Sequence, residues 1–110
     1  MNMVHVYSQR GKAMIVKGSD IEAKNGRKPY ELDGLVVQVK HFVVRLTTPD
    51  NPFKPHKHQQ PELWYVQDGE AIVSLDGTDH PVGTGDLIVI RPWAEHGLKT
   101  ACKATWICLG

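Results

Sequence analysis

Turn signals recur along most of this chain, and their spacing constrains the fold more than any other feature. Between the turns lie short runs of valine, isoleucine, leucine, threonine and aromatic residues. The runs follow one another about every eight to ten residues, which is the rhythm of a β-sandwich or barrel. Seven prolines and ten glycines are spread along the chain, as many short elements joined by turns require. The sequence therefore predicts an all-β fold.

The expected strands are best marked from residue 35 onward. Asp68-Gly69 separates two apolar runs, and this dipeptide suits a tight hairpin turn. Asp76-Gly77 repeats the device, and a glycine-rich turn follows at residues 83–86. The predicted strands are residues 35–48, 63–66, 71–75, 78–82, 87–90, 96–101 and 104–109.

The chain is long enough for one domain, residues 1–110. Apolar residues make up 41 % of the sequence, which is enough to form a core. Residues 1–34 are expected to form an N-terminal strand and loop segment. Within it, residues 13–17 suit a strand, and at most one helical turn follows Ser19.

The charge and hydropathy of the chain limit the classes of partner that it can bind. Thirteen basic and twelve acidic residues give a formal net charge of +1, without the clustered basic surface that nucleic acids require. No apolar run is long enough to span a membrane, and residues 1–7 lack the layout of a signal peptide. We expect a soluble, cytoplasmic protein. Cys102 and Cys108 would then be reduced thiols, packed as small apolar groups, because a terminal hairpin would hold them beyond the ~7 Å that a disulfide tolerates.

Four side chains stand at spacings that suit a metal site: His56, His58, Glu62 and His96. On an extended segment His56 and His58 face the same side, and Glu62 follows the bend at Pro61. Three neutral imidazoles and a carboxylate suit manganese, iron, cobalt, nickel, copper or zinc as a single divalent ion. Taken singly, each of these residues is more often a surface or core group than a ligand.

Two longer patterns contain these four residues. The segment His56-x-His58-x3-Glu62-x6-Gly69 resembles the first cupin motif, and Gly85-Asp86-x5-Pro92-x3-His96 resembles the second. The motif region spans residues 56–96, and the flanking strands extend the likeness to most of residues 35–110. Three positions depart from the family pattern, and none of them is a candidate ligand: Asp50, Ala94 and Thr100.

The resemblance implies a double-stranded β-helix, or jelly-roll, barrel made by the whole chain as one cupin domain. It further implies a metal ion inside the barrel mouth on His56, His58, Glu62 and His96, turn roles for Gly69 and Gly85, and a homodimer. The strand character of the N-terminal residues 4–7 also favours sheet extension across a two-fold axis.

The ligand set favours a functional site over a structural one. An octahedral ion held by these four residues keeps two positions free for a small molecule in the barrel. We expect a metal-dependent enzyme acting on a keto or hydroxy acid, a sugar derivative or a catechol-like compound. Dioxygenase, isomerase, lyase and decarboxylase chemistry all remain open. The alternative is a non-catalytic module that binds a small ligand or metal, although no helix-turn-helix pattern flanks the barrel.

Residues around the four candidate ligands are less clearly assigned by the sequence, and no general acid or base is predicted. Trp64 suits the pocket and the core equally well, and Trp93 is placed to wall the mouth. Arg45 and Lys40 are the cations expected to meet an acidic ligand. His41 and His80 have no partner in the motifs, and His80 is expected to be solvated beside its turn.

Overall fold

The structure is a computed structural model that describes residues 5–7, 11–32 and 34–110. Within these residues it contains nine strands and one short 3-10 helix, so the all-β prediction is confirmed. The elements are β1 (His5–Tyr7), β2 (Ala13–Val16), η2 (Gly18–Asp20), β3 (Phe42–Thr47), β4 (Phe53–His56), β5 (Glu62–Leu75), β6 (Thr78–Gly83), β7 (Leu87–Ile90), β8 (His96–Lys99) and β9 (Ala104–Leu109).

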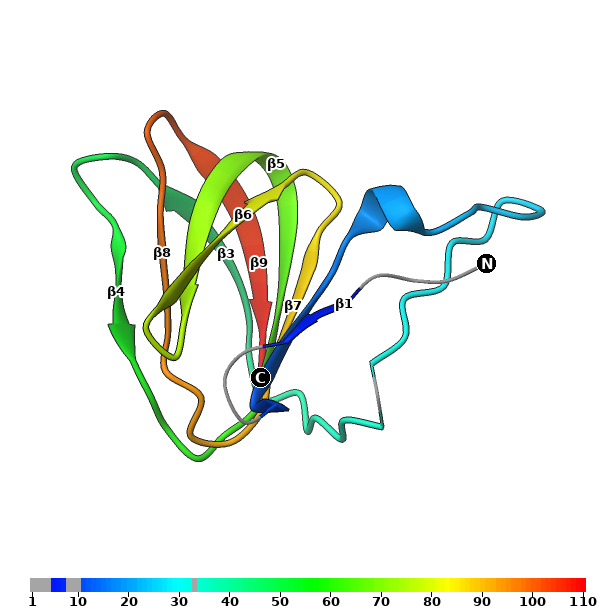
Figure 1. Ribbon diagram of the computed structural model, residues 1–110, viewed down its shortest axis with the longest axis horizontal. Coiled ribbons are helices and arrows are strands. Elements are labelled where there is room, and N and C mark those ends of the chain that lie inside the picture. The colour runs from blue at the N-terminus through cyan, green and yellow to red at the C-terminus, as the bar shows by residue number, and fades with distance from the viewer. Residues whose placement is uncertain (1–4, 8–10, 33) are drawn as a thin grey trace.

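Two antiparallel sheets share strand β5 and enclose a jelly-roll barrel (Figure 1). The first half of β5 lies between β7 and β9 in a larger sheet of order β1-β2-β7-β5-β9-β3. Its second half lies between β6 and β8 in a smaller sheet of order β6-β5-β8-β4. The curvature of β5 therefore closes the barrel, because one strand carries the chain from one sheet into the other.

The prediction of a hairpin turn at Asp68-Gly69 is wrong. Residues 62–75 form one continuous strand, whose pairing with β9 shifts register between Val66 and Asp68, as at a β-bulge. Gly69 has a φ of 101°, and a Cβ at this position would collide with the carbonyl oxygen of Lys103 on the neighbouring chain segment. The glycine lets the strand bend while β9 passes close by. Asp76-Gly77, by contrast, is a tight turn, and Leu75 pairs with Thr78 across it.

The strand expected over residues 35–48 is also shorter than predicted, since only Phe42–Thr47 is extended and paired. The backbone N–H groups of Lys40 and His41 both donate to the carbonyl of Gly110, beyond the last residue of β9. Residues 35–39 have no strand partner among the residues that the structure describes, and Leu35 packs on the outside of the larger sheet. Two of their three β-branched residues, Val36 and Val39, are exposed at 81 % and 62 %, so this composition reflects neither strand pairing nor burial.

Strands β2 and β7 are buried on both faces, which explains their unbroken apolar runs. Inward side chains join a barrel core built around Trp64 and Trp106, and the outward ones form a second cluster under residues 21–35. Asp86 fastens this N-terminal segment to the barrel. Its carboxylate pairs with the Lys17 ammonium and accepts a hydrogen bond of 3.0 Å from the Gly18 backbone.

Two side-chain expectations need correction or extension. Both cysteines are free thiols, as expected, but Cys102 is exposed and only Cys108 is packed in the core. His80 is only partly exposed, and its Nε2 is buried without a hydrogen-bond partner among the described residues, so it is not simply solvated. In the described ranges no helix is long and apolar enough to cross a membrane.

Candidate metal centre

The four candidate ligands come together at one end of the barrel. His56 ends β4, Glu62 begins β5, His96 begins β8, and His58 lies in the loop between β4 and β5. His56 and His96 are register partners across β4 and β8, which run side by side in Figure 1. The three imidazole centroids are 4.5 Å (56 to 96), 4.8 Å (58 to 96) and 5.4 Å (56 to 58) apart. One ring nitrogen of each histidine lies within 4.8 Å of those of the other two.

Backbone carbonyls set the tautomers of two of these histidines. The Nδ1–H of His96 donates to the carbonyl of Ala94 at 2.7 Å, and that of His56 donates to the carbonyl of Lys54 at 3.1 Å. A carbonyl oxygen can only accept, so each Nδ1 carries the proton when the ring is neutral, and each Nε2 presents a lone pair. Metal-binding histidines are commonly oriented in this way.

Glu62 is held beside the histidines by Trp64. The indole Nε1–H of Trp64 donates to Glu62 Oε1 at 3.0 Å, and both side chains are buried. The same Oε1 lies 3.7 Å from His96 Nε2, and the other carboxylate oxygen, Oε2, lies 3.4 Å from His58 Nε2. Trp64 thus belongs to the core and to the site at once, since its ring also contacts that of His96.

The burial of His96 tests whether these residues suit a metal ion. The side chain is fully buried, and burial lowers the pKa of its imidazole below the ordinary value, which favours the neutral ring. Its Nε2 finds no hydrogen-bond partner in the part of the chain that the structure describes, and neither does His58 Nδ1. A buried polar atom without a partner costs about 1–3 kcal/mol. A divalent ion would satisfy such a lone pair, so this His/Glu cluster fits one.

Comparison with known proteins places the chain in a family. A family model described as Cupin domain matches residues 43–110, which is more than half of the chain. The chain belongs to the cupin family. Solved structures agree on the fold of this cupin and, at their low sequence identity, show the fold alone. The epimerase RmlC of Legionella pneumophila, in complex with dTDP-4-keto-L-rhamnose, has 15 % identity and a TM-score of 0.68, with 98 % of this chain and 71 % of that chain covered. A predicted oxalate decarboxylase of Thermotoga maritima has 15 % identity and a TM-score of 0.60, with 99 % and 90 % covered.

One curated relative shares a stretch of sequence with this cupin. The dimethylsulfoniopropionate lyase DddW of Ruegeria pomeroyi is 37 % identical over 49 residues. That match covers 44 % of this chain and 32 % of the lyase, so the chain spans about a third of the length of the curated relative it matches.

His41 and Cys108 lie against the cluster, and the sequence analysis missed both. His41 Nε2 is 3.7 Å from Glu62 Oε2 and 3.6 Å from the thiol of Cys108. Burial raises the pKa of Cys108 to about 12, with the Glu62 carboxylate adding to the effect, so the thiol stays protonated. Glu62, His41 and Cys108 form a second group with metal-ligand spacing. Nothing in the spacing signals it, because the pairing of β3 with β9 brings His41 and Cys108 together.

Aromatic rings line the inside of the cupin barrel beside the histidines. The Phe53 ring lies 4.8 Å from that of His56 and 5.3 Å from those of both Trp64 and Trp106. The guanidinium of Arg45 lies 4.7 Å from the centroid of Phe53, while Lys40 is exposed and precedes the first residue of β3.

Trp93, which was expected to wall the mouth, contacts the site through its backbone. Its N–H donates to the carbonyl of His58 at 2.8 Å and so tethers the loop that carries this histidine. The Trp93 residue has a φ of 69° and is 52 % exposed. Whether its ring walls the mouth stays a prediction.

Proposed function

We propose that this cupin is a divalent-metal-dependent enzyme acting on a small oxygen-rich molecule inside the barrel, with His56, His58, Glu62 and His96 as the metal ligands. One observation carries the proposal. The buried, unpartnered Nε2 of His96 lies 3.7 Å from the Glu62 carboxylate, at the point where the rings of His56 and His58 also meet. Four groups that can each offer a lone pair to one ion therefore lie together.

The bound ion would supply a Lewis acid for a carbonyl, carboxylate or enolate oxygen. The chain's own groups prepare the site for it. Hydrogen bonds to Ala94 and Lys54 orient two imidazoles, and the Trp64 indole fixes the Glu62 carboxylate. Of the three histidines, His96 is fully buried, His58 is partly exposed and His56 is exposed, so the site opens to solvent on the His56 side. Manganese, iron, cobalt, nickel, copper and zinc all suit this ligand set.

Among the reaction classes, we place lyase chemistry on a small organic acid first. The relative DddW carries a lyase name whose substrate, dimethylsulfoniopropionate, is a small carboxylate. Dioxygenase, isomerase and decarboxylase chemistry would use the same ligands, because the fold and the ligands do not determine the reaction.

Turnover assays test this proposal. Chain loaded with each of the six metals is incubated with dimethylsulfoniopropionate and a panel of hydroxy acids, keto acids, sugar derivatives and catechols. Products are followed by NMR and dioxygen by an electrode. We expect turnover of at least one acid and its loss in a His58→Ala chain. Metal-dependent binding without turnover across the panel would favour the alternative, a non-catalytic binding module.

We also propose that the protein is a cytoplasmic homodimer. Its two free thiols suit a reducing compartment. Strand β1 pairs with β2, and β3 pairs with β9, while their other edges have no strand partner among the described residues. The outward side chains of β3 (Phe42, Val44 and Leu46) are each more than half exposed and form an apolar stripe that a second copy would cover.

Light scattering at micromolar concentration is expected to give twice the chain mass, and Val44→Lys with Leu46→Lys should shift that mass toward the monomer. The matched control is Lys99→Ala, on the exposed face of β8. A monomer mass for the unaltered chain would contradict the dimer.

A further inference from the structure

We propose that Arg45 is the residue that selects the substrate, by binding its carboxylate in a pocket between β3 and β4. The inference rests on the proposed function and names the chemical class of its substrate: small molecules with a carboxylate at one end. The two cupin motifs do not include this arginine, and the sequence alone had named it only together with Lys40 as a cation expected to meet an acidic ligand.

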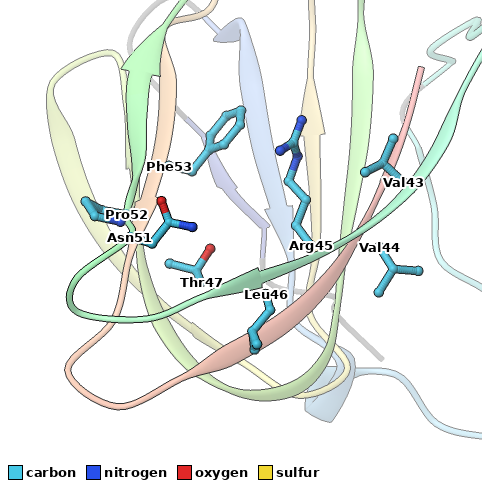
Figure 2. Close-up of a pocket in the computed structure, with 8 residues that line it drawn as sticks. All are labelled: Val43, Val44, Arg45, Leu46, Thr47, Asn51, Pro52 and Phe53. Carbon is cyan, nitrogen blue, oxygen red and sulfur yellow. The ribbon is translucent and has the colours of Figure 1, made fainter.

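The pocket is a cavity of about 290 Å³ lined by side chains of β3, of β4 and of the turn between them. Figure 2 shows the side chains of Arg45 and Phe53 directed toward the inside of the barrel, whereas Val44 and Leu46, which also line the cavity, lie on the opposite side of β3. Thr47 shares the inward face, and its hydroxyl accepts a hydrogen bond of 2.9 Å from the Trp106 indole. The volume is near the lower end of the roughly 300–1,000 Å³ typical of ligand pockets, so the pocket suits a small molecule.

The guanidinium of Arg45 is held by aromatic rings and not by a carboxylate. It lies 4.7 Å from the Phe53 centroid and 5.8 Å from the Trp106 ring. None of the acidic side chains that the structure describes forms an ion pair with it. Stacking on rings restricts the side chain while its N–H groups stay available, which is the arrangement that binds a carboxylate in a bidentate manner.

The position of Arg45 relative to the histidines connects this pocket to the metal centre. The Phe53 ring that carries the guanidinium is also 4.8 Å from the ring of His56. A molecule of a few carbon atoms, anchored by its carboxylate on Arg45, would bring its other end toward His56 and the reacting position.

Propanoate and its neutral counterpart propanamide are the probes for this inference. They are titrated into zinc-loaded, ¹⁵N-labelled chain, and the indole N–H resonance of Trp106, which reports on Thr47 next to Arg45, is followed by NMR. We expect saturable binding of propanoate and at least about tenfold weaker binding of propanamide, because a charge-assisted pair is lost. Arg45→Met should weaken propanoate binding by a similar factor, Arg45→Lys should weaken it less, and the matched control Lys40→Met should leave it unchanged.

The same titration of a His58→Ala chain separates the two proposals. If Arg45 anchors the acid, propanoate should still bind to this metal-depleted chain. Equal affinity of Arg45→Met and the unaltered chain would overturn the inference. So would propanoate binding that survives in Arg45→Met but disappears in His58→Ala, because the metal would then be the anchor. Failure of the unaltered chain to take up zinc would refute the proposed function and still leave the Arg45 comparison measurable.

Discussion

A His58→Ala chain is expected to lose its metal ion and keep its barrel. His58 lies in the loop before β5 with 26 % of its side chain exposed, while the core rests on apolar strands elsewhere. Removing one of four ligands should lower occupancy from about one ion per chain to less than about a tenth after dialysis, because each ligand contributes strongly to metal affinity. His96→Ala should lose the ion as well, and also lose stability, since it leaves a cavity at a fully buried position.

Elemental analysis after dialysis and circular dichroism make this comparison. His80→Ala is the matched control, since His80 lies on β6, outside the cluster. It is expected to retain the ion. Ligand variants that still carried about one transition ion per folded chain would show that the ion is bound elsewhere.

Acidification is the second change with a large expected effect. An imidazole binds a metal only as the neutral ring, and a free histidine titrates near ~6.5. Metal occupancy should therefore fall below about pH 6, with proton uptake, because protons compete with the ion for the imidazole nitrogens. A titration from about pH 8 to about pH 5, with circular dichroism alongside, measures both occupancy and fold.

The pKa of His96 gives the sign of the effect on the metal-free chain. Burial lowers this pKa in the folded state, so the unfolded chain takes up a proton first as the pH drops. The free energy of unfolding should thus be highest above about pH 6.5 and decrease below it, down to the folded pKa. If metal occupancy stayed flat through the titration while the fold melted, the histidines would be structural groups and the metal proposal would fail.

Local sequence predicted the fold well where pattern and pairing agree. Residues 87–90 and 104–109 are strands with the predicted boundaries, because a turn precedes each apolar run and each run pairs along its whole length. The hairpin prediction at Asp68-Gly69 was wrong because this dipeptide occurs both in hairpin turns and at bulges. Only the nearby β9 backbone decides between the two. The prediction for residues 35–41 was wrong because a β-branched run favours a strand without specifying its partner, and Val36 and Val39 are in fact exposed.

In the candidate site, too, local spacing predicted some of the residues and strand pairing determined the others. The spacing of His56, His58, Glu62 and His96 was enough to expect that they lie together. His41 and Cys108 were not predictable, since their contact depends on the register of two strands distant in sequence. The inward direction of Arg45 was equally hidden, because β3 carries apolar residues on both faces and its phase could not be read from the pattern.

If one ion is held by His56, His58, Glu62 and His96, the position of a bound metal in a crystal shows it without inference from activity. An anomalous-difference map from crystals loaded with manganese, iron, cobalt, nickel, copper or zinc would give this position. We expect a single strong peak, about 2.0–2.3 Å from one ring nitrogen of each of the three histidines and from the Glu62 carboxylate. A map without a peak at these residues, or with its peak between His41 and Cys108, would contradict it.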